Sequence, residues 1–289
     1  MAKTVNSGFT IFLNSITPSA SERAKATSHR ASIEAKLDAK FGIFRMFETG
    51  SFKHGTGVSV HSDVDFFVSL KSNQPILSSS TLTAVRDALK ERFPTTYIHA
   101  SRPAVVLDFG QGYERVEIIP AYFQEKLVDG ARFRIPGVVG EWLDSSPEIH
   151  VKYVNDCNSI EAVKGGTKDL ARLVKAWKYY RDVPISSFYL EMRAAAYMKE
   201  EKSVIYSLDV LYFLKRLQGH ALADMNDPTG ATGRIQACSS TANKTIALSK
   251  LDRAVSRAQK AVDFEKVGNT EKAFEYWNLL FNENFPGYY

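Results

Sequence analysis

Two segments in the first hundred residues repeat apolar side chains at the three- and four-residue spacing of a helix. The first begins at Thr17-Pro18, a pair suited to cap and start a helix, and ends near Gly42. The second covers residues 81–93. We expect one amphipathic helix in each segment.

Runs rich in β-branched and aromatic residues lie around the second helix, as is typical of strands. The predicted strands are residues 44–50, 64–68, 96–100, 104–109 and 115–119. Gly110-Gln111-Gly112 supplies a hairpin turn between the last two. Residues 51–57 fit a loop or a single helical turn, and the polar residues 71–80 fit a loop. This order predicts an α+β fold for the first half of the chain.

The pattern changes in the second half. Residues 120–166 hold several prolines and glycines, and we interpret them as an irregular connection. From Thr167 onward the apolar spacing is helical. The predicted helices are one that follows Thr167, and residues 185–199, 207–220, 244–267 and 269–281. We therefore expect two domains: an α+β domain over residues 1–165, which includes the N-terminal helix, and a helical domain over residues 166–289.

Composition narrows the class of protein. The 289 residues are 44% apolar and 24% charged, as in globular proteins. The net charge of +5 and the pI near 9.0 suit a phosphate-rich ligand. Cys157 and Cys238 argue against a disulfide scaffold and a cysteine-based metal site. With no signal-peptide pattern and no apolar run long enough to span a bilayer, we expect a cytoplasmic protein with no membrane partner.

Two aspartates open the strand at residues 64–68. Asp63 and Asp65 project to the same face, because side chains at i and i+2 of a strand do so. Their charges repel at neutral pH, and a cation between them removes that cost. Mg²⁺ prefers carboxylates together with substrate phosphates. Two such ions can clamp the attacking and leaving oxygens of a phosphoryl displacement.

Gly50-Ser51 follows the preceding strand and opens a turn. A glycine there lets the backbone approach a ligand closely, and the amides of the turn, with the Ser51 hydroxyl, can bind a phosphate. Phosphate-binding amides and metal-binding carboxylates thus lie within one short stretch. Nucleotidyl transfer from a triphosphate requires both. A third carboxylate should come from a neighbouring strand, where Glu117 is the first candidate and Asp108 the alternative.

These residues resemble the CD-NTase family, the bacterial cGAS/DncV-like nucleotidyltransferases within the DNA polymerase β-like superfamily. Gly-Ser followed by a Ser-Asp-Val-Asp strand is similar to the hallmark of the superfamily. The narrower resemblance extends from about residue 44 to residue 286. It rests on residues 116–121, 133–136, 170–178, 184–191 and 273–286.

The resemblance implies roles for individual residues. The catalytic, metal-binding acids would be Asp63, Asp65 and Glu117, with Glu where the family more often has Asp. Gly50 and Ser51 would form the turn that binds the donor phosphates. Lys175 and Ser187 match positions that contact the triphosphate, and Tyr189 matches a position that stacks on a base.

The fold implied by the resemblance is a bilobed nucleotidyltransferase, with a mixed-sheet catalytic lobe and a helical C-terminal lobe. Such enzymes synthesise cyclic di- or trinucleotides from NTPs, here ATP and at least one further NTP, with two Mg²⁺ or Mn²⁺ ions. The product would be an alarm signal in anti-phage defence that activates a separate effector. A nucleic-acid or protein activator is left open.

Two other functions remain open at the level of the sequence. In the first, the chemistry is the same but the nucleotide is transferred to an RNA, a protein or a small molecule. In the second, the protein is a nucleotide-binding sensor without turnover, because Glu117 stands at the third acidic position. The basic stripe also has two interpretations, a phosphate contact at Lys175 and a solvated or protein-docking face at Lys168, Arg172 and Lys178.

Overall fold

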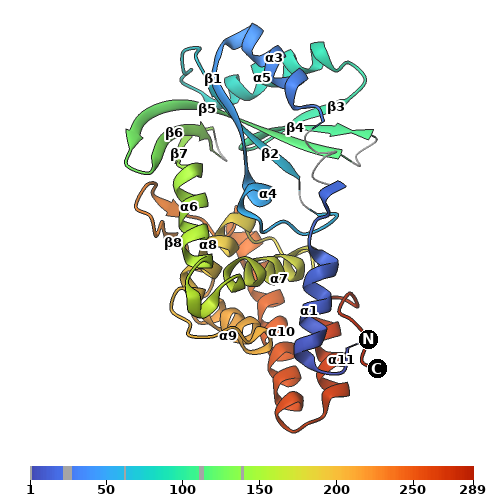
Figure 1. Cartoon of the computed structure of the whole chain (residues 1–289). Helices are drawn as coiled ribbons and strands as arrows, with labels where there is room; N and C mark the ends of the chain where they lie inside the picture. The colour runs from blue at the N-terminus through green and yellow to red at the C-terminus, as the bar shows by residue number, and fades with distance from the viewer. Residues whose placement is uncertain (1, 22–27, 62, 111–113, 138–139) are drawn as a thin grey trace.

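The computed structural model describes residues 2–21, 28–61, 63–110, 114–137 and 140–289. A sheet covered by two helices forms the upper half in Figure 1, a stack of helices forms the lower half, and α4 lies at the junction. The helices are α1 (Val5–Ile16), α3 (Arg30–Phe41), α4 (Gly50–His54), α5 (Ser78–Arg92), α6 (Pro147–Asn158), α7 (Gly166–Tyr180), α8 (Ser187–Met198), α9 (Tyr206–Gly219), α10 (Thr241–Lys266) and α11 (Thr270–Leu280). The strands are β1 (Ile43–Thr49), β2 (Val64–Leu70), β3 (Tyr97–Ser101), β4 (Ala104–Phe109), β5 (Glu114–Leu127), β6 (Gly130–Pro136), β7 (Trp142–Ser145), β8 (Met225–Asn226) and β9 (Arg234–Ile235).

The main sheet is mixed, which confirms the expected α+β class with C-terminal helices. Its strand order is β1-β2-β5-β4-β3, and β6 and β7 extend it from the second half of β5. The pair β2–β5 is parallel, whereas β1–β2, β4–β5 and β3–β4 are antiparallel. The two central strands are therefore β2 and β5, the strands that carry the candidate acids.

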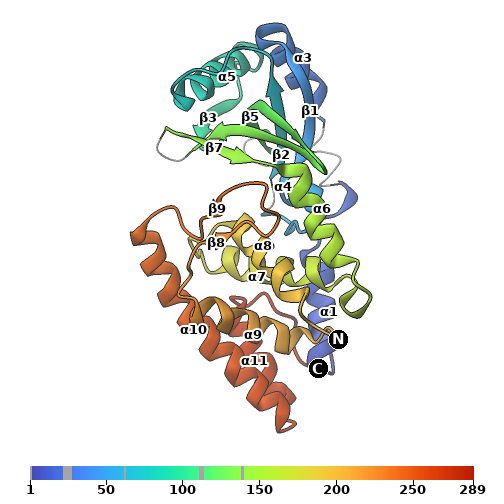
Figure 2. The same ribbon diagram turned by 90° about the vertical axis from the view of Figure 1, so that its left-hand side faces the viewer.

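The two faces of the sheet have different surroundings. In β2, Val64, Phe66 and Val68 are buried in one cluster with apolar residues of α3 and α5. In β5, Val116 and Ile118 belong to the same cluster. Strand alternation then turns the intervening residues of both strands toward the helical half, which lies below the sheet in Figure 2. Because α3 and α5 bury one face of the sheet, only the side chains on the opposite face can form a site.

The first predicted helix is only partly confirmed. α3 ends where expected, because Gly42 adopts φ 61° and its amide donates to the Asp38 carbonyl. Residues 28–29, however, form a turn immediately before α3, so the helix does not run unbroken from Thr17-Pro18. Residues 22–27 lie outside the described part of the chain. The predicted helix at 81–93 and the five predicted strands correspond to α5 and to β1–β5; Gln111 and Gly112, in the expected hairpin turn, also lie outside the described residues.

The expected irregular connection over residues 120–166 is wrong. This stretch contains the second half of β5, then β6, β7, α6 and a 3₁₀ turn at Glu161–Val163. Its prolines and glycines lie largely at element boundaries: Gly130 opens β6, Pro136 ends it, and Pro147 occupies the first position of α6. The turn-forming residues therefore separate short elements from one another, and they do not mark a loop.

The sequence analysis did not anticipate α1. Thr4 and Ser7 form a reciprocal capping box at its start, and its apolar residues lie on one face. The Phe9 ring meets Trp277 edge-on at 4.9 Å, and Phe12 lies 4.6 Å from Phe281. α1 accordingly lies beside α11 in Figure 1, with the two described chain ends close together. Aromatic packing thus holds the start of the chain against the last helix.

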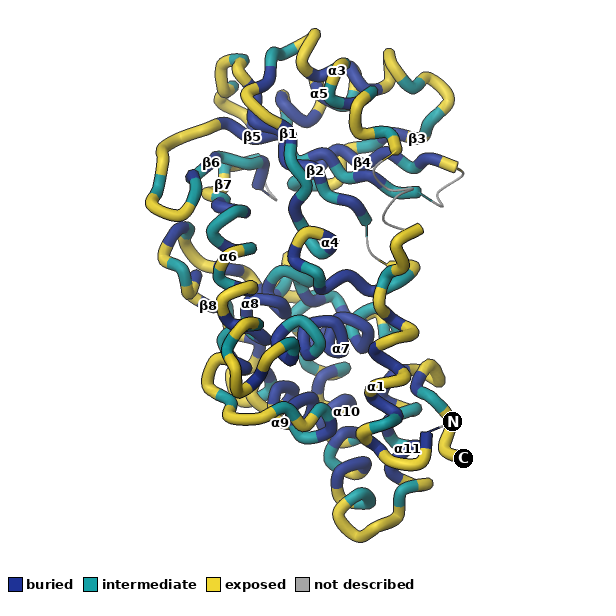
Figure 3. The backbone as a smooth tube through the Cα atoms, in the orientation of Figure 1, coloured by how far each residue is buried: buried dark blue, intermediate teal, exposed yellow. Residues whose placement is uncertain are grey.

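The buried core of the helical half includes segments from both ends of the chain (Figure 3). Val5 and Phe9 of α1, and Val154 and Cys157 of α6, share one apolar cluster with α7–α11. The predicted boundary between two domains at residues 165 and 166 stays a proposal. In the structure, α1 and α6 precede this boundary but pack with the helices that follow it. Of the helices in the described residues, none has the length and apolarity needed to cross a membrane.

Candidate active site

Three residues lie side by side across the middle of the sheet. Thr49 of β1 is in register with Asp65 of β2, and Asp65 is in register with Glu117 of β5. All three line a cavity of about 730 Å³ between the sheet and the helices α6, α7 and α8. Asp63, two residues before Asp65, lines the same cavity. The structure therefore brings together the three acids that the sequence singled out.

Crowding and burial perturb the aspartates. Burial, with the nearby Glu117 charge, raises the pKa of Asp63 to about 7, although Arg115 acts against the shift. Burial, Glu117 and Asp63 raise the pKa of Asp65 well above its usual range. In both carboxyl groups, burial and repulsion between the acids outweigh the positive charge nearby. This is the electrostatic condition that a bound cation relieves.

Gly50 is required where the chain passes closest to these acids. Its φ of 63° lies in the left-handed region, which favours glycine. A Cβ atom built at Gly50 would stand 1.8 Å from Asp65 Oδ2. Only a residue without a side chain lets α4 begin directly beside the carboxylate. Ser51 follows Gly50 in the first turn of α4, and both residues line the cavity.

Arg115 already contacts two of the acids. Its Nε lies 3.1 Å from Asp63 Oδ2, and its Nη2 donates to Glu117 Oε1 at 2.9 Å. Asp108, the alternative third acid, is opposite Arg115 in the β4–β5 pair and does not line the cavity. The register places Glu117, and not Asp108, beside Asp65.

The donor set fits a hard divalent cation in its chemistry. Asp63, Asp65 and Glu117 offer only carboxylate oxygens, which Mg²⁺ and Mn²⁺ favour. Burial and mutual repulsion raise the pKa values of the two aspartates, as given above, and a bound cation would offset both effects. Among the described residues, no three His, Cys, Asp or Glu side chains stand in a ready-made metal-binding group. The acids therefore suit a metal but must reorient to hold one.

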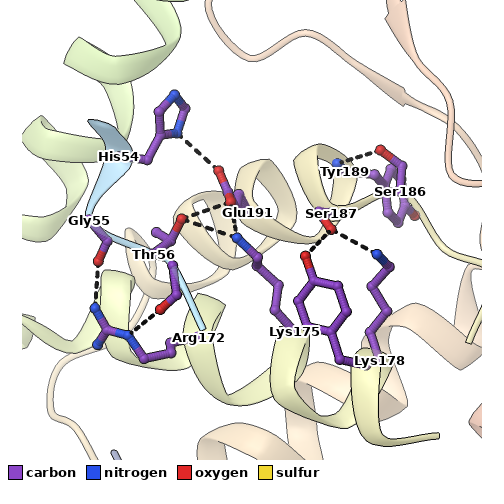
Figure 4. Close-up of polar contacts among 12 residues, drawn as sticks. His54, Gly55, Thr56, Arg172, Lys175, Lys178, Ser186, Ser187, Tyr189 and Glu191 are labelled. Atoms are coloured by element: carbon purple, nitrogen blue, oxygen red, sulfur yellow. Dashed lines mark hydrogen bonds and ion pairs between the residues drawn. The ribbon is translucent and has the colours of Figure 1, made fainter. Parts of the chain in front are cut away.

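Lys175, an expected phosphate contact, is in a buried ion-pair network (Figure 4). Its side chain is 0% exposed, and its Nζ donates to Glu191 Oε1 at 2.5 Å. Thr56 Oγ1 donates to the same oxygen at 2.7 Å, and His54 Nδ1 lies 3.0 Å from Glu191 Oε2. Although burial opposes ionisation, Lys175 holds the pKa of Glu191 well below its usual range. The Lys175 charge is therefore neutralised within the protein.

Arg172 strengthens the same junction between the lobes. Its guanidinium donates to the Gly55 carbonyl at 2.6 Å and to the Gly57 carbonyl at 2.9 Å. Together with the Thr56 contact, these bonds tie the loop after α4 to α7 and α8 (Figure 4). Arg172 thus faces the loop after α4, and the interpretation of the basic stripe as a solvated or protein-docking face is wrong for this residue.

Lys178 presents its ammonium group to the cavity. Its Nζ donates to Ser187 Oγ at 2.9 Å (Figure 4). The same atom lies 4.4 Å from the centre of the Tyr179 ring. No carboxylate of the described residues comes within ion-pair distance of this ammonium group. Burial, with the Lys175 charge nearby, lowers the pKa of Lys178 to about 8. A cation held without a counter-charge is suited to receive an anionic ligand.

Tyr189 is not where the resemblance implied. Its side chain is fully buried, does not line the cavity, and donates its hydroxyl hydrogen to the Ala223 carbonyl at 2.8 Å. The expected stacking of Tyr189 on a base is therefore wrong, since no face of its ring is open to a ligand. The neighbouring Phe188 lines the cavity, as does Tyr179, which stacks on His61 with ring centres 5.1 Å apart.

A loop from the helical half closes the far side of the cavity. Asp227 accepts from the backbone and hydroxyl groups of Thr229 and Thr232, and its Oδ2 lies 3.0 Å from His150 Nε2 on α6. These contacts lower the pKa of Asp227 despite its burial. The pair fixes residues 227–232 against α6, and the following Arg234 and Gln236 line the cavity.

The sequence analysis missed Arg115, Lys178, Tyr179 and Phe188 as residues of this site. Strand alternation could have found Arg115, because it shares the face of Glu117 two positions later. Helical spacing did group Lys178 with Lys175, three positions earlier on α7, but Lys178 was interpreted as part of a solvated or protein-docking face. Nothing in the sequence indicates which of these two lysines is neutralised by Glu191.

Comparisons with known proteins agree with the resemblance found in the sequence. The model of the SMODS family, described as the Second Messenger Oligonucleotide or Dinucleotide Synthetase domain, matches residues 3–158, more than half of the chain. A probable cyclic nucleotide synthase of Bacillus cereus (strain VD146) is 21% identical over 239 residues, which are 80% of this chain and 70% of that protein.

Two solved structures share the fold over nearly the whole chain. CdnC of Escherichia coli MS115-1, with ATP, aligns with a TM-score of 0.75 and 18% identity over 98% of this chain and 99% of its own. The cyclic AMP-GMP synthase DncV of Vibrio cholerae, with the linear intermediate pppA(3′,5′)pG, has a TM-score of 0.66 and 14% identity, with 98% of this chain and 88% of its own covered. The resemblance to the CD-NTases is confirmed: this chain belongs to the SMODS family of second messenger oligonucleotide or dinucleotide synthetases, which are nucleotidyltransferases.

Proposed function

We propose that this protein makes a cyclic di- or trinucleotide from ATP and at least one further NTP. The observation that carries the proposal is the register of Asp65 with Glu117, with Asp63 two residues away, opposite an unpaired cation at Lys178. The carboxylates suit metal ions at the reacting phosphate, and the cation suits the rest of the triphosphate. The cavity of about 730 Å³ between them lies within the range of small-molecule sites.

The proposed roles follow the geometry. Asp63, Asp65 and Glu117 are the catalytic acids and hold the metal. When bound, two divalent cations, Mg²⁺ or Mn²⁺, would activate the attacking hydroxyl and stabilise the pyrophosphate leaving group. Gly50 and Ser51 contact the donor phosphates beside Asp65.

On the helical side, Lys178 and Ser187 contact the triphosphate, since they already share a hydrogen bond in the cavity wall. Lys175, which the family resemblance favoured, acts indirectly: its pairing with Glu191 positions Thr56 and the loop after α4. Phe188 offers the ring face for a base in place of Tyr189, because Tyr179 is already stacked on His61 and lies against the Lys178 ammonium group.

Closing a ring requires two transfers in one site for a dinucleotide and three for a trinucleotide. The acids and Lys178 would act on the first donor, and the linear intermediate would then turn so that its own triphosphate becomes the donor. The other side of the cavity, with Arg234 and Gln236, would hold the acceptor nucleotide. We place this reaction in the cytoplasm, where NTPs are made.

We further propose, from the family resemblance alone, that the product is an alarm signal in anti-phage defence. A separate effector would bind it. Activation by a protein or nucleic acid belongs to the same proposal and is tested by adding candidate activators to the reaction described next.

The decisive experiment is an incubation of the purified protein with all four NTPs and Mg²⁺, or Mn²⁺, followed by mass spectrometry. We expect a phosphatase-resistant cyclic product that is absent with Asp63→Asn and Asp65→Asn. A linear product alone, or nucleotide incorporation only when an RNA, protein or small-molecule acceptor is present, would overturn the proposal. Metal-dependent NTP binding with no turnover, even for Glu117→Asp, would indicate a sensor.

A further inference from the structure

Three carboxylates surround the guanidinium of Arg115. Asp63 and Glu117 contact it at 3.1 Å and 2.9 Å. Asp108 stands directly across the β4–β5 pair from Arg115, where side chains of paired residues share a face. Of these three, the proposed function uses Asp63 and Glu117 and leaves Asp108 without a role.

The contacts of Arg115 conflict with metal binding. A carboxylate oxygen that accepts from a guanidinium offers less of its charge to a cation, and two cations that share one oxygen repel each other. A divalent ion that takes Asp63 Oδ2 and Glu117 Oε1 as ligands would therefore displace Arg115. The displaced guanidinium keeps its charge, so another carboxylate within reach would attract it.

Asp108 is placed to receive it. Its charge already raises the pKa of Arg115, together with those of Asp63 and Glu117. Asp108 also lies near His99, whose Nδ1 is 3.8 Å from Asp108 Oδ2. Movement of Arg115 from the acids of β2 and β5 to the acid of β4 requires side-chain rotation only.

We propose that Arg115 is a positioning residue that controls metal entry: it holds Asp63 and Glu117 in the metal-free protein and transfers to Asp108 when a divalent cation binds. The inference rests on the proposed function, because it takes Asp63 and Glu117 as metal-binding acids. Arg115 and the metal then compete for the same two carboxylates, so the arginine lowers the affinity of the empty site for a divalent cation.

The test measures Mn²⁺ binding to the nucleotide-free protein by the electron paramagnetic resonance signal of free Mn²⁺. Arg115→Gln should tighten the dissociation constant by about fivefold, because two partly exposed ion pairs no longer compete. Arg216→Gln removes the same charge from an exposed arginine paired with Glu200 in the helical half, and it should change nothing.

A double-mutant cycle separates transfer of Arg115 from general electrostatics. Asp108→Asn should weaken Mn²⁺ binding about threefold in the native background and much less in Arg115→Gln, because only the native chain needs Asp108 as an acceptor. Equal effects in both backgrounds would show two independent charges and overturn the inference. So would unchanged or weaker binding in Arg115→Gln.

A further control distinguishes this failure from failure of the proposed function. Asp65→Asn should abolish Mn²⁺ binding in every background. If it does and the cycle is additive, the acids bind metal and only the role of Arg115 is wrong. If Mn²⁺ binding is absent from the native protein, or survives in Asp65→Asn, the acids are not the metal site and both proposals fall.

Discussion

Two lysines on α7, three residues apart, differ in how their charges are balanced. Lys175 is fully buried and its charge is matched by Glu191, with Thr56 and His54 completing the network. Lys178 meets only a hydroxyl and a ring face, and burial lowers its pKa to about 8. The charge of Lys175 is balanced within the protein, whereas the charge of Lys178 would be balanced only by a bound ligand.

The comparison separates stability from function. Burying a charge is costly unless it is paired, so removal of one member of a closed pair destabilises the fold. Removal of a charge that lacks a partner relieves the fold and costs only ligand binding. Asp65 belongs with Lys178 in this respect, because burial and repulsion from Glu117 and Asp63 raise its pKa well above the usual range.

The largest expected effect comes from a charge that lacks a partner within the protein, that of Asp65. Asp65→Asn should lower product formation by about 10³-fold or more, because it removes charge from the centre of the proposed site. The melting temperature should stay equal or rise, since the substitution relieves repulsion with Glu117 and Asp63. Product analysis and thermal unfolding of the same preparation check both statements; a large loss of stability would contradict the comparison.

In the buried Lys175–Glu191 pair, Glu191→Ala should reduce the free energy of unfolding by about 3–5 kcal/mol, because Lys175 is left buried without its partner. Urea denaturation measures the change. The double variant Lys175→Met/Glu191→Met should recover most of the loss, since an apolar pair carries no uncompensated charge. If Glu191→Ala is as stable as the native protein, the network does not hold the lobes together.

A matched pair of lysine variants sharpens the contrast. Lys178→Met should weaken binding of a non-hydrolysable ATP analogue by about 10- to 100-fold, as expected for a lost charged hydrogen bond, and leave stability equal or higher. Lys175→Met should show the reverse, with lower stability because Glu191 loses its counter-charge. Calorimetric titration measures the affinity and thermal unfolding the stability of each variant. Equal changes in both quantities for the two variants would contradict the comparison between the two lysines.

The smallest effect is a pH dependence. Because the pKa of Lys178 is lowered to about 8, its charge is lost as the pH rises through 8, and affinity for the ATP analogue should fall several-fold between pH 7 and pH 9. Between pH 8 and the ordinary value near 10.5, the unfolded chain holds more protons at this residue, so stability should rise across that window. Lys178→Met should show neither trend.

The sequence predicts the site better on its sheet side than on its helical side. Strand alternation and spacing are local, and they place Asp63, Asp65 and Glu117 together, although only the pairing of β2 with β5 decides for Glu117 over Asp108. Lys175 and Lys178 differ only through Glu191, which comes from another helix. Tyr189 and Phe188 are adjacent, and tertiary packing alone decides which of them faces the cavity.

The fold shows the same limit. α5, β1–β4 and the helices after residue 166 follow their local patterns closely, whereas residues 120–166 were misinterpreted because prolines at element ends resemble those of a loop. α1 has a clear apolar face, but its helical state is stabilised by distant aromatic residues such as Trp277.

The most direct test of the central claim is a crystal structure of the protein with a non-hydrolysable ATP analogue and Mg²⁺. We expect the metal on Asp63 and Asp65, the triphosphate in contact with Ser51 and Lys178, and Lys175 still paired with Glu191. A triphosphate bound elsewhere, or a metal that does not contact the two aspartates, would contradict the account.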